Sequence, residues 1–107
     1  MKIDWNKYKN NIPGKLRTKS KISFDVLWQD PLLDKSGVRL FGITQFNPNQ
    51  IILDTKQSDK EAVLTTWHEF LHAIADSYEV KLTESEVRRL EKAFPYFKEF
   101  FDKLEGK

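Results

Sequence analysis

The central part of the chain alternates apolar and polar residues in three short runs, and this pattern predicts strands. The first run, 22–28, places apolar residues at every second position and ends at the turn residues 30–31. Two further runs, 38–46 and 50–54, flank the turn 47–49 and predict a β-hairpin. The three runs together predict a small, mainly antiparallel three-stranded sheet.

After these runs, the apolar spacing changes to that of a long amphipathic helix. Ser58 and Glu61, three residues apart, form a capping box that opens this helix. Steps of three and four predict a buried stripe made of Val63, Leu64, Trp67, Leu71, Ile74 and Tyr78. A second, more polar stripe beside it is made of Thr65, His68, His72 and Asp76. The polar stripe should therefore border the core.

A second capping box, Thr83 with Glu86, opens another helix, which Pro95 should end or kink. An additional helical segment is expected beyond Pro95, with apolar residues at Phe97, Phe100, Phe101 and Leu104. A terminal segment this apolar should dock, either on its own domain or on a second copy. The predicted fold class is α+β: the sheet packs on the long helix and on the helix after it, with a C-terminal helical segment added.

The N-terminal part carries a less regular pattern. Residues 4–11 predict a short helix that ends near Asn11, because Pro13-Gly14 interrupts the spacing. A basic cluster follows, made of Lys15, Arg17, Lys19 and Lys21. It predicts a solvated loop leading into the first strand. A phosphate-binding patch is the alternative, but no aromatic residues are interleaved with the cluster.

Composition narrows the function classes. The 107 residues form one small domain, 1–107, and 18 Lys+Arg against 16 Asp+Glu give no electrostatic case for nucleic-acid binding. The chain has no cysteine, so nitrogen and oxygen atoms would have to hold any metal. No apolar stretch is typical of a secretory signal or a membrane span, so we expect a soluble, cytoplasmic protein.

The pentapeptide 68–72, HEFLH, contains both histidines of the chain. On a helix, residues four apart share a face, so His68 and His72 can reach one zinc ion while Glu69 faces the water bound to it. Zinc lowers the pKa of that water, and Glu69 can accept its proton as the water attacks a peptide carbonyl. The alternative is a surface helix on which these side chains are only solvated.

Two histidines and a water leave tetrahedral zinc one protein ligand short, and only a carboxylate can supply it. The downstream candidates are Asp76, Glu79, Glu84, Glu86 and Glu91. Asp76 is placed to hydrogen-bond an imidazole rather than to bind the metal. A strictly antiparallel second helix would bring Glu91 level with the histidines, whereas a steeper crossing would favour Glu84 or Glu86.

The pentapeptide, a short connection and then Glu84-Ser85-Glu86-Val87 resemble the gluzincin metallopeptidases, whose third ligand is a glutamate on the helix after the HExxH helix. In the related HtpX-like branch, that glutamate stands three residues before a small or apolar core residue, as Glu84 stands before Val87. In size and layout the chain resembles the minigluzincins, which are soluble single-domain members. The resemblance implies one catalytic Zn²⁺, Glu84 as the first choice of ligand and Glu86 as the second.

The resemblance also implies hydrolysis of a peptide or protein substrate laid against an edge strand, for which 38–44 and 50–54 are the candidates. It implies a latent form in which the C-terminal segment, 96–107, blocks the cleft, within the chain or by exchange in a homodimer. One residue departs from the pattern: Arg88 stands where HtpX-like peptidases have an aspartate that supports a histidine. Candidates for contact with the oxyanion are Arg88, Tyr78 and Tyr96.

Two other functions remain open from the sequence. The same fold could serve as a zinc-binding or interaction module without turnover, or the chain could be a small helical adaptor without metal.

Overall fold

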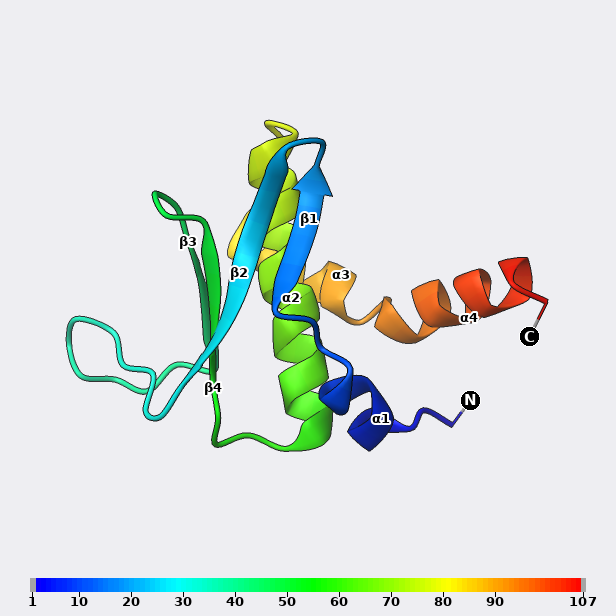
Figure 1. The fold of residues 1–107 in the computed structure, drawn as a ribbon, viewed down its shortest axis with the longest axis horizontal. Helices are drawn as coiled ribbons and strands as arrows, with labels where there is room; N and C mark the ends of the chain where they lie inside the picture. Colours follow the sequence, from blue (N-terminus) through cyan, green and yellow to red (C-terminus); the bar gives the residue numbers. More distant parts are fainter. Residues whose placement is uncertain (1, 107) are drawn as a thin grey trace.

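Four strands and four helices make up the computed structural model, which describes residues 2–106 (Figure 1). Their bounds are α1 Trp5–Asn10, β1 Lys15–Lys19, β2 Ile22–Gln29, β3 Gly42–Gln45, β4 Gln50–Asp54, α2 Asp59–Ser77, α3 Glu84–Glu91 and α4 Phe94–Leu104. The sheet lies against α2, with α1 beside the first half of that helix (Figure 1). The predicted α+β class is confirmed.

The sheet is mixed, with the order β1-β2-β4-β3, so the prediction of three mainly antiparallel strands is only partly right. The β3–β4 hairpin is confirmed as antiparallel, but β4 pairs with β2 in parallel, Val26 opposite Ile51. The composition of the strands explains this order. β4 carries Ile51-Ile52-Leu53 and is suited to the centre of the sheet, whereas the more polar β3 is left at an edge.

The basic cluster predicted as a loop is largely a strand. Within β1, Leu16 and Thr18 face inward, while the alternating cations Lys15, Arg17 and Lys19 point outward. Alternation of this kind is typical of a charged edge strand, which resists pairing with other chains. A tight turn joins β1 to β2, and Lys21 in it has a φ of 68°, a left-handed conformation.

The buried residues of α2 overlap with the predicted stripe at Val63 only. The buried residues of the helix are Ala62, Val63, Thr66, His68, Glu69, Ala73, Ala75 and Ser77, whereas Tyr78 is exposed. Small side chains such as Ala73 pack against the large core residues Phe24, Ile51 and Leu53. The small side chains let the helix approach the sheet closely, and Glu69 is buried between them.

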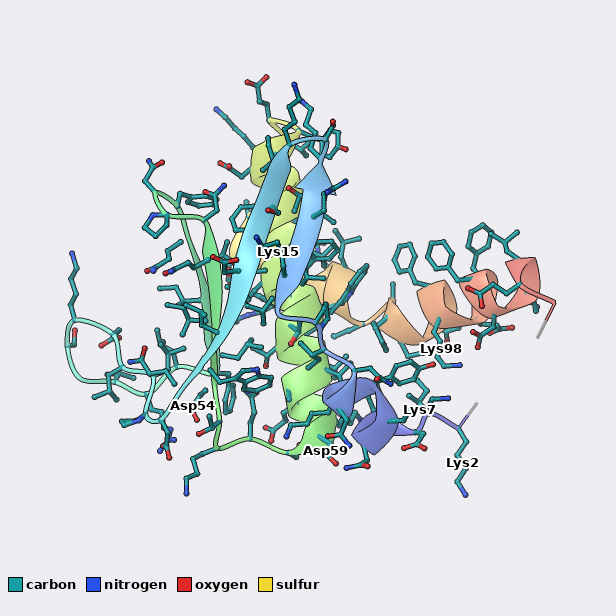
Figure 2. The ribbon with its side chains drawn as sticks, viewed as in Figure 1. Lys2, Lys7, Lys15, Asp54, Asp59 and Lys98 are labelled. Atoms are coloured by element: carbon teal, nitrogen blue, oxygen red, sulfur yellow. The ribbon has the colours of Figure 1, made fainter. Side chains whose placement is uncertain are left out.

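Asp54, at the end of β4, fixes the long loop between β2 and β3 (Figure 2). Its buried carboxylate accepts hydrogen bonds from the backbone N–H groups of Leu32 and Lys56 and from two nitrogens of Arg39. The Arg39 hydrogen bond, together with those from the two backbone groups, outweighs desolvation and holds the pKa of Asp54 well below its usual range. This network sets the path of the chain into β3.

Both predicted capping boxes are present, at Ser58 and Thr83. The additional helical segment predicted beyond Pro95 is present as α4, but it begins one residue earlier, at Phe94, with Pro95 in its first turn. The ring of Phe94 contacts those of Trp5, Tyr8 and Trp67. Beyond this anchor α4 extends away from the sheet, and aromatic side chains stand along it with no other segment over them (Figures 1 and 2). Within residues 2–106, no helix has the length and apolar character needed to cross a membrane.

At Gly42 the backbone of β3 lies close to α2. A Cβ at this position would lie 2.6 Å from Thr65 Cγ2 and 3.2 Å from Glu69 Cγ. We expect Gly42→Ala to destabilise the fold by about 1–3 kcal/mol through overpacking, measured by urea denaturation.

Thr65→Ser provides the matched partner variant, because it removes Cγ2 but keeps the Oγ1 hydrogen bond to Gln57. The double variant should therefore lose less stability than the sum of the two single changes. A Gly42→Ala protein as stable as the wild type would show that this contact does not constrain the edge strand.

Candidate metal centre

A reversal of the chain between α2 and α3 brings Glu84 to the histidines. Helix α2 ends with Glu79 in the left-handed region, at a φ of 56°, and Val80 N–H donates to the carbonyl of Ala75 at 2.8 Å. Together with the bond from Glu79 N–H to Asp76 O, these features form a Schellman motif. Glu79, one of the ligand candidates, is therefore part of the helix end, and Glu84 begins the next helix.

The Glu84 carboxylate lies between the two imidazoles. Its Oε1 is 2.7 Å from His68 Nε2, and its Oε2 is 2.9 Å from His72 Nε2. The ligand atoms of these three residues lie within 4.8 Å of one another, so the group could hold a metal ion. Desolvation raises the pKa of Glu84, but the neighbouring histidines outweigh it, and the net shift is downward.

Glu86, the second choice of ligand, has a different role. Its carboxylate accepts the backbone N–H of Thr83 at 2.8 Å, and Thr83 Oγ1 accepts the N–H of Glu86 in return. This capping box occupies the carboxylate and lowers the pKa of Glu86. The structure thus brings Glu84, and not Glu86, to His68 and His72.

Glu91 supplies a carboxylate to the other side of His68. Its Oε1 lies 3.0 Å from His68 Nδ1, and this contact leaves Nε2 as the nitrogen directed at Glu84. Carboxylates in this position fix the orientation of metal-binding imidazoles. Arg88 has its Nε 3.8 Å from Glu84 Oε1.

Sequence reasoning considered Glu91 only as a ligand. The seven-residue spacing from Glu84 is the signal for its observed place, since two helical turns put both residues on one face.

Asp76 is exposed, and its contact with an imidazole stays a prediction.

Glu69 is buried beside the triad and held by β3. Thr44 Oγ1 lies 2.8 Å from Glu69 Oε1 and 2.9 Å from the backbone carbonyl of Glu69. Burial raises the pKa of Glu69, although the Thr44 hydrogen bond and the two histidines oppose the shift. The role of Thr44 was not foreseen, because it depends on which strand lies next to α2.

Two hollows meet at the triad and share Gly42, Glu69 and Glu84 in their walls. The His68 arm has a volume of about 450 Å³ and is also lined by Leu40, Phe41, Thr65, His68, Arg88, Glu91 and Lys92. The His72 arm, about 340 Å³, is also lined by Ile43, Thr44, Phe46 and His72. Together the arms form a cleft along β3. Of the three oxyanion candidates, Arg88 lines it, whereas Tyr78 and Tyr96 do not.

The donor set matches zinc chemistry. Two imidazole nitrogens and one carboxylate oxygen are the protein ligands of many catalytic zinc sites, which keep a fourth position for water or substrate. His68 is nearly buried, with 11% of its side chain exposed, whereas Glu84 is 53% exposed, so the centre is reachable from the cleft.

In comparisons with known proteins, no family model matches the chain, and no curated protein or solved structure shows significant similarity to it. The His-His-Glu group is therefore the observation on which a functional assignment has to rest.

Zinc binding should depend on Glu84 and not on Glu86. We expect about one zinc per chain in the wild type and in Glu86→Gln, measured by metal analysis and chelator competition. Glu84→Gln and His68→Ala should each weaken affinity by more than about tenfold, because a lost ligand costs more than a lost supporting partner. Equal affinities of Glu84→Gln and Glu86→Gln would contradict this assignment.

Proposed function

We propose that this protein is a zinc-dependent peptidase in which His68, His72 and Glu84 bind the metal. The observation that carries the proposal is the convergence of these three side chains beside a buried glutamate in an open cleft. Glu69 is buried next to the histidines. Neither a zinc-binding module without turnover nor a surface helix with solvated side chains would require this.

When bound, zinc would polarise the carbonyl of a peptide bond and lower the pKa of the attacking water. Glu69 would accept the proton of that water and later deliver it to the leaving amine. Thr44 fixes the direction of the Glu69 carboxylate, and Glu91 fixes the ring of His68. The burial of Glu69 limits the access of bulk water to the proton that it carries.

The substrate would bind along β3 as an added strand. Asp54 N–H donates to Phe41 O, and hydrogen-bonded pairs alternate along an antiparallel ladder, so Ile43 and Gln45 also face β4. The backbone N–H and C=O groups of Gly42 and Thr44 consequently face the open edge. Since β4 is central, β3 is the substrate strand of the two candidates from the sequence.

Glu69→Gln tests the catalytic assignment directly. Turnover of an unstructured peptide should fall by roughly 10²–10⁴-fold, because a general base is lost, while zinc content stays unchanged. Glu79→Gln is the matched control, since Glu79 lies outside both arms of the cleft. A zinc-loaded wild type whose turnover is no higher than that of Glu69→Gln would favour the module without catalysis.

The latency implied by the family resemblance remains part of the proposal. None of the described residues of α4 lines either arm, so the cleft of the same chain is open in this structure. Tyr96 and Leu104, which are 71% and 68% exposed, are free to dock on a second copy.

Removal of residues 96–107 should raise peptide turnover if this segment blocks the cleft of another copy. Dilution of the full chain should raise its specific activity as well, because dissociation would open the cleft. Turnover that is independent of both truncation and concentration would count against latency.

A further inference from the structure

The two arms of the cleft differ in charge. The lining of the His68 arm includes two cations, Arg88 and Lys92, together with the apolar Leu40 and Phe41 and the carboxylates of Glu69, Glu84 and Glu91. The residues that line the His72 arm include no lysine or arginine, and Phe46 gives it an aromatic wall. A peptide in the cleft would therefore meet cations on one side of the metal centre only.

Of these two cations, Lys92 has fewer ionic contacts than Arg88. It caps the C-terminal end of α3, and within residues 2–106 its ammonium group makes no salt bridge. The guanidinium of Arg88 already has an acidic neighbour, since its Nε lies 3.8 Å from Glu84 Oε1. The carboxylates of Glu84 and Glu91 both contact His68. Lys92 is thus the positive charge in the His68 arm that remains available to a ligand.

The direction of the peptide decides which of its residues meets Lys92. β3 runs from Gly42 to Gln45, so a peptide paired with it in the more stable antiparallel sense runs from Gln45 towards Gly42. The part that follows the cleaved bond then lies in the His68 arm.

We infer that the His68 arm binds a carboxylate on the part of the substrate that follows the cleaved bond, with Lys92 as the specificity-determining residue. The inference rests on the proposed function, whose substrate class it narrows. The carboxylate comes either from an Asp or Glu side chain or from the free C-terminus of a short peptide. The His72 arm, with Phe46 in its wall, receives the residue before the bond.

Binding can be measured without turnover, on zinc-loaded Glu69→Gln of the full chain. The probes are blocked hexapeptides with phenylalanine before the bond and aspartate, asparagine or lysine after it. Aspartate should bind about twofold to fivefold more tightly than asparagine, as expected for a partly exposed ion pair. Adding Lys92→Glu should reverse the order and favour lysine.

The matched control is Arg89→Glu, which makes the same change of charge on α3 but outside both arms. It should leave the preference for aspartate intact. Equal binding of the three blocked peptides together with equal binding of free and amidated C-termini, or an equal response to Lys92→Glu and Arg89→Glu, would overturn the inference.

Peptides with a free or an amidated C-terminus separate the two sources of the carboxylate. Tighter binding of the free-acid asparagine peptide than of its amidated form assigns the carboxylate to the C-terminus, and a preference for aspartate among the blocked peptides assigns it to the side chain; both support the inference. Hydrolysis by the wild type without any preference for a carboxylate would overturn this inference but leave the proposed peptidase function standing. Selective binding of aspartate without hydrolysis would support it and contradict the proposed peptidase.

Discussion

The position of the Glu84 carboxylate between two imidazole nitrogens is the constraint on which the rest of the site depends. Glu84 is the first residue of its helix, so its place is set by how α2 ends and how α3 begins. The Schellman motif after α2 reverses the chain, and the Thr83 cap fixes the first turn of α3. Val87, which is completely buried, anchors that turn in the core.

Four glutamates in this small region are distinguished by their partners rather than by their chemistry. Glu84 contacts both histidines, and Glu91 contacts Nδ1 of His68. Glu86 accepts the backbone N–H of Thr83 in a helix capping box. Glu69 is the buried one, and a hydroxyl of the edge strand holds it. The same side chain thus lies between two imidazoles, orients one of them, caps a helix or is buried beside them, depending on its place in the fold.

Local patterns in the sequence were sufficient for the helices and for the histidine pair. Capping boxes act within four residues, and two histidines four apart must share a helix face, so neither depends on the rest of the fold. The choice of the carboxylate beside the histidines needed more, because helical spacing alone left Glu84, Glu86 and Glu91 open. Family resemblance favoured Glu84, and the capping bond of Glu86 supplies the physical reason.

Features that depend on long-range packing could not be predicted in the same way. The parallel pairing of β2 with β4 reflects competition between strands for the centre of the sheet. The contact of Thr44 with Glu69 follows only after β3 takes the edge beside α2. The course of α4 away from the cleft was also not foreseen, because its apolar face indicates that it docks but not where.

Anomalous diffraction at the zinc edge, on crystals of the zinc-loaded protein, tests the central claim most directly. We expect one zinc peak at about 2.0–2.2 Å from His68 Nε2, His72 Nε2 and a Glu84 oxygen. The carboxylate of Glu91 should still contact His68 Nδ1. A peak bonded to the histidines but to a different carboxylate, or no peak between them, would contradict the central claim.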